Sequence, residues 1–471
     1  MAKKGKKGKK GKVSDGLSSV YKADQRTCPK YALHSPLTNS HLSPVLLPTP
    51  LHSPPLPPPP KNEGPEITTT GLTLKFRGTC MAPRLGDAFA LQTHVDGIKA
   101  EVAQHRIHKC AEKQLDTLDL AGCNFSFLPE DIASSREVRQ RLVDLNLARN
   151  QLFNSDSVFL VLQRLENLRR LAIPNNHLNG SLSELAGSLM HLEELDLDGN
   201  QLTRLPDACG NWTKLRVFSA GNNSLTELPA GVEKWEKLEQ CNLRDNKFVS
   251  LPSTISKWTL LKRLFIGGNA LTAIPSCVSS FQLLVELDAR KNALTELPME
   301  LAQCLNLEHL NLGDNKLEEI PQQIVQRLTK IRELYLYRNK LETLPDAVGL
   351  LSSLQKLSVS KNNLKTLPES VGDLTTLKEL YLNGNAKFTA FPNSVGKLGL
   401  LRELAARNCP KLKSLPREIE TCDSLVELDI RSGGKKDVCK VPQEVTDKLA
   451  LQKCTVRGAV IKKAKGKKGK K

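Results

Sequence analysis

The stretch LEHLNLGDNKLEEIP, residues 307–321, contains the pattern that decides the fold. It reads L-x-x-L-x-L-x-x-N-x-L-x-x-I-P, and a second clear copy runs from Leu354 to Pro368. Such self-similarity, here at about 23 residues, is typical of a repeat protein, in which one core extends through every unit. The second apolar residue of each copy marks fourteen units: Leu118, Leu145, Leu171, Leu195, Phe218, Cys241, Leu264, Leu287, Leu310, Leu334, Leu357, Leu380, Leu404 and Leu428.

Each unit predicts one short strand. The central L-x-L alternation has a period of two, so the leucines face a core and the residues between them face outward. A single unit cannot bury its apolar side, and we expect neighbouring units to stack about 4.8 Å apart in a parallel sheet. A recurrent Asn follows each strand, where its amide can satisfy turn backbone groups that the sheet does not reach. The Asn column comprises Asn150, Asn176, Asn200, Asn223, Asn246, Asn269, Asn292, Asn315, Asn339, Asn362 and Asn385, with Cys123 and Cys409 in the first and thirteenth units.

The tryptophans follow the same repeat. Trp212, Trp235 and Trp258 are the three tryptophans of the chain, and each is 23 residues from the next. Their column continues with apolar residues such as Phe281 and Leu351. We therefore predict a buried layer on the convex side, in preference to a ligand site.

This repeat resembles the 23-residue intracellular leucine-rich repeats with LPxxI after the Asn turn, as in the Ras-group leucine-rich-repeat proteins and the Scribble-type scaffolds. The resemblance covers roughly residues 115–432. It implies an α/β solenoid, a horseshoe of about fourteen repeats with a concave parallel sheet. It also implies no cofactor and a role in binding proteins, among them a small GTPase or another signalling protein.

Five segments are expected along the chain. Residues 1–65 are basic and then rich in Pro, which predicts disorder, and four Ser/Thr-Pro steps there are candidate phosphorylation sites. Residues 66–114 are expected to cap the first repeat, with a helix at about 96–113. The repeats occupy 115–432, residues 433–460 close the other end, and 461–471 form a disordered Lys-rich tail.

The net charge of +18 is concentrated at the two ends. The first twelve residues hold seven lysines and the last ten hold seven more, so the rest of the chain is close to neutral. The tails are either solvated flanks or contacts for an anionic partner, such as RNA, a ribosome, an import receptor or an acidic membrane surface. They contain no aromatic residue to stack on bases, so any binding to nucleic acid should be electrostatic and independent of sequence.

Several functions find no support in the sequence. No secretory signal or membrane span is predicted, and the twelve cysteines are scattered as expected of free thiols in a reducing compartment. We therefore expect a cytoplasmic location, with the nucleus as the alternative. No phosphate loop, zinc-protease or serine-hydrolase motif occurs, so an enzyme is not expected. His105, His108 and Cys110 lack a fourth ligand at a recognised spacing, so no metal is expected.

The concave face is the predicted binding site. Since Leu334 and Leu336 point inward, Tyr335 and Tyr337 should stand on the concave sheet, and Tyr381 occupies the same column as Tyr335. Aromatic residues there either shield the sheet or anchor a partner, and we favour the anchor. The candidate partner-binding residues are Arg263, Phe265, Glu286, Asp288, Arg290, His309, Asn311, Glu333, Tyr335, Tyr337, Lys356, Glu379 and Tyr381, with Ser358 nearby.

The outward strand positions together carry a formal charge of about −5, from twelve acids and seven bases. An acidic hollow repels a nucleic acid, whereas the basic tails attract one, so the two surfaces require different partners. One further hypothesis is that a lysine tail folds back into the hollow. The favoured function is a non-enzymatic scaffold that binds a protein on its concave face, within intracellular signalling. The alternative is an RNA- or ribosome-associated factor recruited by its Lys-rich tails.

Overall fold

The structure is a computed structural model, which describes residues 85–432 and 439–462. The predictions of a disordered region at 1–65, of a cap over 66–84 and of a lysine tail after residue 462 lie outside the described residues. No helix in the described part of the chain combines the length and the apolar character needed to cross a membrane.

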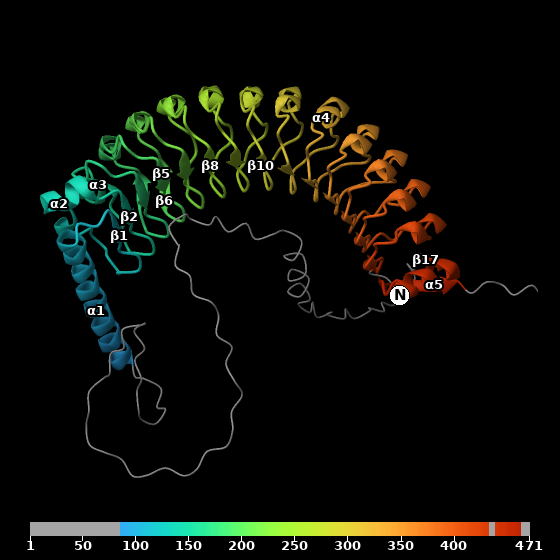
Figure 1. Ribbon diagram of the computed structural model, residues 1–471, viewed down its shortest axis with the longest axis horizontal. Helices are drawn as coiled ribbons and strands as arrows, with labels where there is room; N and C mark the ends of the chain where they lie inside the picture. Colours follow the sequence, from blue (N-terminus) through green and yellow to red (C-terminus); the bar gives the residue numbers. More distant parts are fainter. Residues whose placement is uncertain (1–84, 433–438, 463–471) are drawn as a thin grey trace, which may run out of the picture. The chain divides into compact units, whose positions relative to one another are not determined.

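A single parallel sheet runs through the repeats, and all of its neighbouring strands pair in register. Each repeat supplies one strand of three residues, and the inner side of the resulting arc carries all of them (Figure 1). The fifteen strands are β1 (Thr117–Asp119), β2 (Asp144–Asn146), β3 (Arg170–Ala172), β5 (Glu194–Asp196), β7 (Val217–Ser219), β8 (Gln240–Asn242), β9 (Arg263–Phe265), β10 (Glu286–Asp288), β11 (His309–Asn311), β12 (Glu333–Tyr335), β13 (Lys356–Ser358), β14 (Glu379–Tyr381), β15 (Glu403–Ala405), β16 (Glu427–Asp429) and β18 (Thr455–Arg457). The α/β leucine-rich-repeat solenoid is thus confirmed, with β18 added beyond the fourteen predicted units.

Short helices form the outer side of the arc (Figure 1). Most begin directly after the recurrent Pro, whose fixed φ suits a helix start and whose missing N–H costs no hydrogen bond there. These segments are η2 (Glu130–Ala133), η3 (Glu184–Ser188), η4 (Asp207–Asn211), η5 (Ala230–Lys234), η6 (Ser253–Lys257), η7 (Ser276–Ser280), η8 (Met299–Gln303), α4 (Gln322–Arg327), η9 (Asp346–Leu350), η10 (Glu369–Asp373), η11 (Asn393–Lys397) and η12 (Arg417–Thr421).

The predicted tryptophan layer lies immediately beneath these helices. Trp212, Trp235 and Trp258 are fully buried, and their rings stack at centroid distances of 5.9 and 6.0 Å. Each indole N–H donates to a backbone carbonyl in the preceding repeat at 2.9 Å. Since each ring also finds its hydrogen-bond partner, the core interpretation of these tryptophans is confirmed.

The Asn column forms a ladder of hydrogen bonds along the turns. Asn362, for example, accepts from Leu341 N at 3.1 Å and donates to Leu336 O at 2.9 Å and to Val359 O at 3.0 Å. One amide therefore joins two successive repeats through backbone groups that the sheet leaves unpaired. The residue before each Asn has positive φ, as at Arg338 and Lys361 with φ of 53° and 56°.

The N-terminal end departs from the regular repeat. The predicted helix is part of the longer α1 (Leu85–Glu112), in which Ala103, Ile107 and Cys110 are buried while Val102 is half-buried. The longer second unit contains a true α-helix, α3 (Ser155–Leu162), since its extra residues allow full turns. α2 (Arg136–Arg141) precedes β2, and β4 (Asn179–Ser181) pairs with β6 (Gln201–Arg204) in a separate small sheet.

The C-terminal end is covered by residues 439–462. β18 extends the main sheet beside β16, and α5 (Gln443–Leu451) buries Val445 and Leu449. β17 (Cys439–Pro442) pairs with β19 (Ala459–Lys462) beside the last turn. The unpaired edge of β16 is thereby covered, as repeat proteins require at their ends.

Ten cysteines lie in the described residues, and all are free thiols, most of them buried. Cys304 and Cys422 occupy the tryptophan column, and each thiol donates to a backbone carbonyl of the preceding repeat as the indoles do. The eight buried cysteines are therefore structural residues of the core, and Cys277 and Cys454 pack against it half-buried.

Candidate binding surface on the concave sheet

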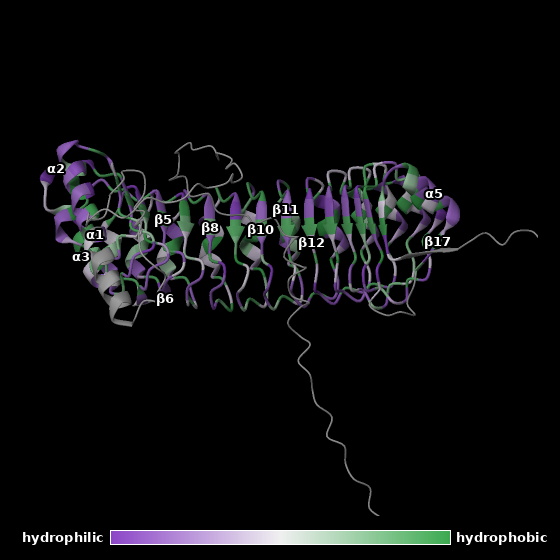
Figure 2. Cartoon of the chain, turned by 90° about the horizontal axis from the view of Figure 1, so that it is seen from below, coloured by the Kyte–Doolittle hydropathy of each residue, from purple (hydrophilic) through white to green (hydrophobic). Residues whose placement is uncertain are grey.

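Three columns of outward-facing side chains line the concave sheet. They lie one residue before, one residue after and three residues after each marker leucine, and all thirteen candidate residues belong to them. Seen from below, the strands stand side by side with hydrophilic and hydrophobic residues alternating along them (Figure 2). In register, Arg263 is opposite Glu286, Glu286 is opposite His309, and His309 is opposite Glu333. The candidate residues therefore form one continuous surface over β9 to β14 and the turns after β10 and β12.

The tyrosines correct one expectation about this surface. Tyr335 and Tyr381 lie outside the main apolar cluster, as predicted, yet only 4% and 8% of their surfaces are exposed. They do not project from the sheet as open anchors. Parallel strands bring neighbouring side chains against each ring, and long charged side chains cover what remains.

Lys356 and a set of glutamates enclose the two rings. The Lys356 ammonium lies 5.9 Å from the ring centre of Tyr335, 5.5 Å from that of Tyr381, and 2.5 Å from Glu379 Oε2. The Tyr381 hydroxyl oxygen lies 2.9 Å from Glu379 Oε2 and 2.6 Å from Glu403 Oε2, so its single proton is held between two carboxylates. Burial, followed by these carboxylates, raises the pKa of Tyr381, so the hydroxyl keeps its proton. These ion pairs and hydrogen bonds form a network around Lys356, which we call the lattice. Its charged atoms lie at the concave surface.

Glu403 was not among the predicted residues, although it belongs to the same column as Glu379, one strand further along. Glu403 comes directly before its marker leucine, as Glu379 does, so the same sequence position identifies both residues.

His309 stands between two glutamates. Its Nδ1 lies 3.4 Å from Glu333 Oε2, within ion-pair range, and Glu286 is opposite it on the other side. Glu333 raises the pKa of His309 above its usual range, against the opposing effect of burial. Burial raises the pKa of Glu286, while His309 lowers that of Glu333. The pairing with Glu333 therefore favours the protonated form of His309 in this part of the surface.

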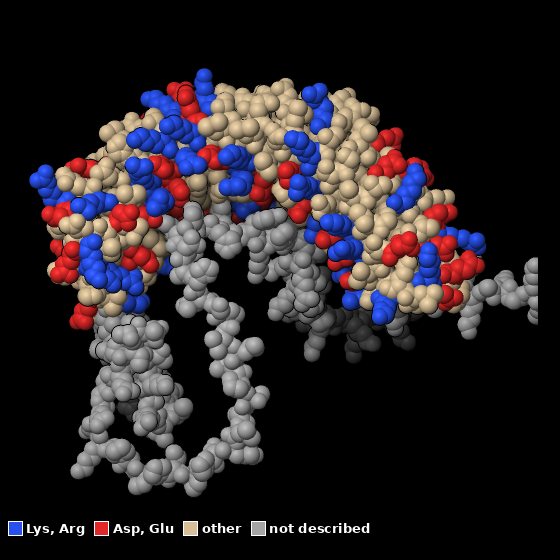
Figure 3. All heavy atoms as spheres, in the orientation of Figure 1, with Lys and Arg blue, Asp and Glu red and all other residues tan. Residues whose placement is uncertain are grey.

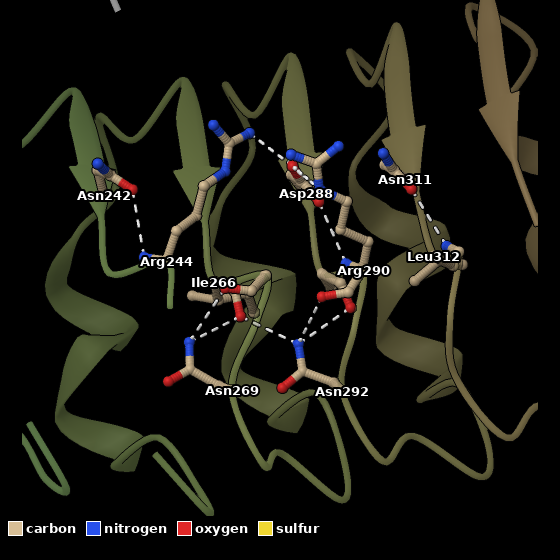
Figure 4. Close-up of polar contacts among 12 residues, drawn as sticks. Asn242, Arg244, Ile266, Asn269, Asp288, Arg290, Asn292, Asn311 and Leu312 are labelled. Atoms are coloured by element: carbon tan, nitrogen blue, oxygen red, sulfur yellow. Dashed lines mark hydrogen bonds and ion pairs between the residues drawn. The ribbon is translucent and has the colours of Figure 1, made fainter. Parts of the chain in front are cut away.

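Arg244 is the largest omission of the sequence-based prediction. Its guanidinium lies 4.2 Å above the ring of Phe265 and 2.5 Å from Asp288 Oδ2. Figure 4 shows Arg244 and Arg290 converging on Asp288 from either side. Phe265 and Asp288 are consequently buried, and the exposed parts of this cluster are its arginines. The sequence could have identified Arg244, because it occupies the same position in its repeat as Arg290 does, three residues after the marker.

Tyr337 and Asn311 have specific local supports. The Tyr337 ring lies directly over Gly313, where a Cβ would come within 2.4 Å of the ring, so only glycine fits beneath it. Asn311 accepts from Gly313 N at 3.1 Å and so fixes the same turn. Tyr337 is the most exposed of the three candidate tyrosines.

The N-terminal part of the hollow holds a second polar cluster. Asp198 accepts from Ser219 Oγ at 2.6 Å, from Gly221 N at 2.5 Å and from Asn242 Nδ2 at 3.0 Å. Neighbouring Asp196 has no such set of donors. Burial, reinforced by the Asp198 carboxylate, raises the pKa of Asp196 to about 7. The hollow is therefore less negative at neutral pH than its formal charge of about −5.

The remaining surfaces differ in character. On the face shown in Figure 3, basic and acidic side chains are intermixed along the repeats. A shallow pocket lies on the convex side, between Met299, Leu305 and Arg327. Of the residues weighed as metal ligands, Cys110 is buried, whereas His105 and His108 are exposed, and His108 pairs with Glu112. Over residues 85–432 and 439–462, no cluster of three or more metal-ligating side chains occurs.

Comparisons with known proteins agree with this architecture. A family described as a leucine-rich repeat region matches residues 305–453, and one described as a leucine rich repeat matches 114–135 and 191–212. A search of curated protein sequences gave no match.

Solved structures resemble the chain over most of its length. A leucine-rich-repeat protein of Leptospira interrogans is 28% identical, with a TM-score of 0.61 over 74% of this chain and 97% of that one. An internalin from Listeria monocytogenes is 17% identical, with a TM-score of 0.54 over 78% of this chain and 90% of that one. The chain therefore contains leucine-rich repeats and has the fold of leucine-rich-repeat proteins.

Proposed function

We propose that the chain is a non-enzymatic interaction module that binds a protein partner on its concave face. Leucine-rich repeats generally serve protein–protein interaction. The observation that carries the proposal is the lattice around Lys356, in which Glu333, Glu379 and Glu403 are held in fixed positions around two buried tyrosines. A rigid surface loses little conformational entropy when a partner binds.

The lattice also indicates the chemistry of the partner. Across β12 to β16 the first outward column reads Glu333, Lys356, Glu379, Glu403 and Glu427, so it is acidic overall. Lys356 pairs with Glu379, Glu333 lies within ion-pair range of His309, and Glu427 within that of Arg457, so neighbouring groups hold these carboxylates while the column keeps its excess of acids. We infer that the partner presents Lys or Arg side chains to this column, since complementary charge favours encounter and orientation. A signalling protein such as a small GTPase, in the cytoplasm, is the partner class suggested by the resemblance.

The test is affinity capture from a lysate with three full-length baits. The first is the unchanged chain, and the second carries Glu333→Gln, Glu379→Gln and Glu403→Gln. Gln keeps an oxygen that can accept from the tyrosine hydroxyls, so charge is removed with little change in packing. The third is a matched control with Glu233→Gln, Glu236→Gln and Glu418→Gln, three exposed residues of the convex side.

We expect a partner that the control bait retains and the concave variant loses, with at least a tenfold drop in affinity once the partner is purified. A partner that both variants retain equally would show that the concave column is not the binding surface.

A further inference from the structure

A second charged surface lies on the flank that the chain follows after each strand. We call this the turn flank and define it as the segment from the residue two positions beyond the marker leucine to the Pro directly before the next outer helix, for example 359–368. In repeats 10–14 the described residues of this flank include ten bases and one acid, Glu342. In repeats 4–9 the same segments hold six bases and seven acids. Among repeats 4–14, the excess of bases on this flank is thus confined to repeats 10–14.

The basic side chains are exposed and arranged one repeat after another. Seven exposed lysines lie along this flank: Lys340, Lys361, Lys365, Lys387, Lys411, Lys413 and Lys440. Glu342, the single acid, contacts Lys365 and Lys387 at 2.8 Å each, so its charge is already compensated. Arg338 and Lys340 of repeat 10 pair with Asp314 and Glu318 of repeat 9, and the formal charge of the flank nevertheless stays positive.

Two arginines extend this surface toward the sheet. Arg407 and Arg431 each lie 2.6 Å from Asp429 Oδ2, and Asp429 is fully buried beneath them. Two guanidiniums share one carboxylate, and their outer atoms remain accessible. A positive charge is consequently held in place by the fold at the edge of the turn flank.

The backbone leads from this flank toward the C-terminal lysines. Lys440 of β17 forms a parallel bridge with Ser414 of the preceding turn, and β17 pairs with β19 as far as Lys462. The described chain therefore ends on the turn flank, and the Lys-rich residues 463–471 follow directly in sequence.

The composition of the flank distinguishes between classes of polyanion. None of the exposed large apolar residues in the described chain belongs to the turn flank of repeats 10–14. A membrane surface usually requires such an anchor in addition to charge. Of the aromatic residues of this flank, Phe388 and Phe391 are buried and pack edge to face at 5.0 Å, and Tyr337 is half-buried with its ring against Gly313, so the described part of the flank offers no open aromatic face for stacking on bases.

From these observations we propose that the turn flank of repeats 10–14 binds a nucleic acid through its phosphodiester backbone, without sequence preference. The flank presents regularly spaced cations, and the repeating charge of the backbone is the complementary chemistry. The acidic concave column is a separate surface, so a protein partner and a nucleic acid could be held at the same time. This inference does not depend on the proposed protein-binding function.

The test measures binding of a fluorescein-labelled single-stranded oligouridine of about 20 nucleotides to the full-length chain, by fluorescence anisotropy at about 50 to 200 mM salt. One variant carries Lys361→Gln, Lys411→Gln, Lys413→Gln and Lys440→Gln. A matched control carries Lys214→Gln, Lys237→Gln, Lys257→Gln and Lys397→Gln, exposed lysines outside the flank. Both variants lose the same charge and keep both lysine tails.

We expect the flank variant to lose at least tenfold in affinity at about 100 mM salt, and its salt dependence to be shallower by roughly 2.8 in log–log slope. The control should change affinity less than about twofold. Glu342→Gln removes the single acid and should strengthen binding by about threefold, a gain that misfolding cannot produce.

Two outcomes would overturn the inference. If flank and control variants weaken oligouridine binding equally, the tails and the net charge account for it. If the flank variant binds oligouridine normally but loses sedimentation with phosphatidylserine vesicles, the surface recognises anionic membranes instead.

Discussion

At the scale of single residues, the side chains of the concave sheet show that facing outward differs from being accessible. Tyr335 and Tyr381 face outward from the sheet and are nevertheless buried, because Lys356, Glu379 and Glu403 close over them. The atoms that a partner can reach are carboxylates and cations of neighbouring strands. Substituting a tyrosine would therefore disturb the sheet, whereas Glu→Gln changes test the surface itself.

Asp196 gives a prediction about pH. Its pKa in the folded chain is about 7, against 3.8 for an unperturbed Asp. Between these values the folded state binds this proton more tightly than the unfolded state, so the contribution of Asp196 to stability falls as pH rises. Asp196→Asn should therefore raise the free energy of unfolding by about 1 to 3 kcal/mol at pH 8 and change it little at pH 4. Thermal denaturation at both pH values measures the difference.

The control for this measurement is Asp346→Asn, which removes an exposed carboxylate from η9. Its Tm shift should be small at either pH. Equal Tm shifts of Asp196→Asn at pH 4 and pH 8 would contradict the raised pKa.

At the scale of the element, the repeat unit depends on its turn as much as on its strand. The buried Asn amide joins two successive repeats, and the residue before it is held at positive φ in every regular unit. Where Cys409 replaces Asn, the thiol still lies 3.5 Å from Leu382 O, so one of the contacts is kept. Asn and Cys both place a buried hydrogen-bond donor at this position of the turn.

Asn362 tests the turn. Asn362→Ala leaves Leu341 N, Leu336 O and Val359 O without their partner and should cost about 2 to 4 kcal/mol of stability. Asn362→Cys should cost roughly 1 kcal/mol less, because a weak donor remains. Urea denaturation followed by circular dichroism compares the two. Identical losses would show that the packing of the side chain, and not its hydrogen bonds, matters here.

At the scale of the whole molecule, stability depends on covering both ends of a sheet that could otherwise continue. The described N-terminal end is covered by α1, and the C-terminal end by β18 and α5. A solenoid without such covers exposes its core and an unpaired strand edge.

Removal of residues 433–471 tests the C-terminal cover. It exposes the edge of β16 and the core around Leu428 and Ile430, so the shortened chain should self-associate and lose at least about 5 °C in Tm. Size-exclusion chromatography with light scattering measures the first effect and calorimetry the second. A chain that lacks only residues 463–471 is the matched control and should stay unchanged. A monomeric, equally stable truncation at residue 432 would show that β18 and α5 are dispensable.

The sequence by itself determined the repeat, the strand register and the tryptophan layer, because each follows from a period that survives in every copy. Leu310 and Leu334 lie opposite each other as their shared column predicts, and Trp235 is buried between its neighbours. The same period placed all thirteen candidate residues on one face, although their role in binding remains a prediction.

Only the tertiary structure decided which of those residues a partner can reach. Burial of Tyr335, the pairing of Arg244 with Asp288 and the closure of Glu403 over Tyr381 arise between strands that are distant in sequence. The length and rotamer of side chains on adjacent strands decide which one covers another, and a linear pattern carries no information on this. The alignment of the turn flank and its continuity with β19 likewise depend on stacking the repeats in space.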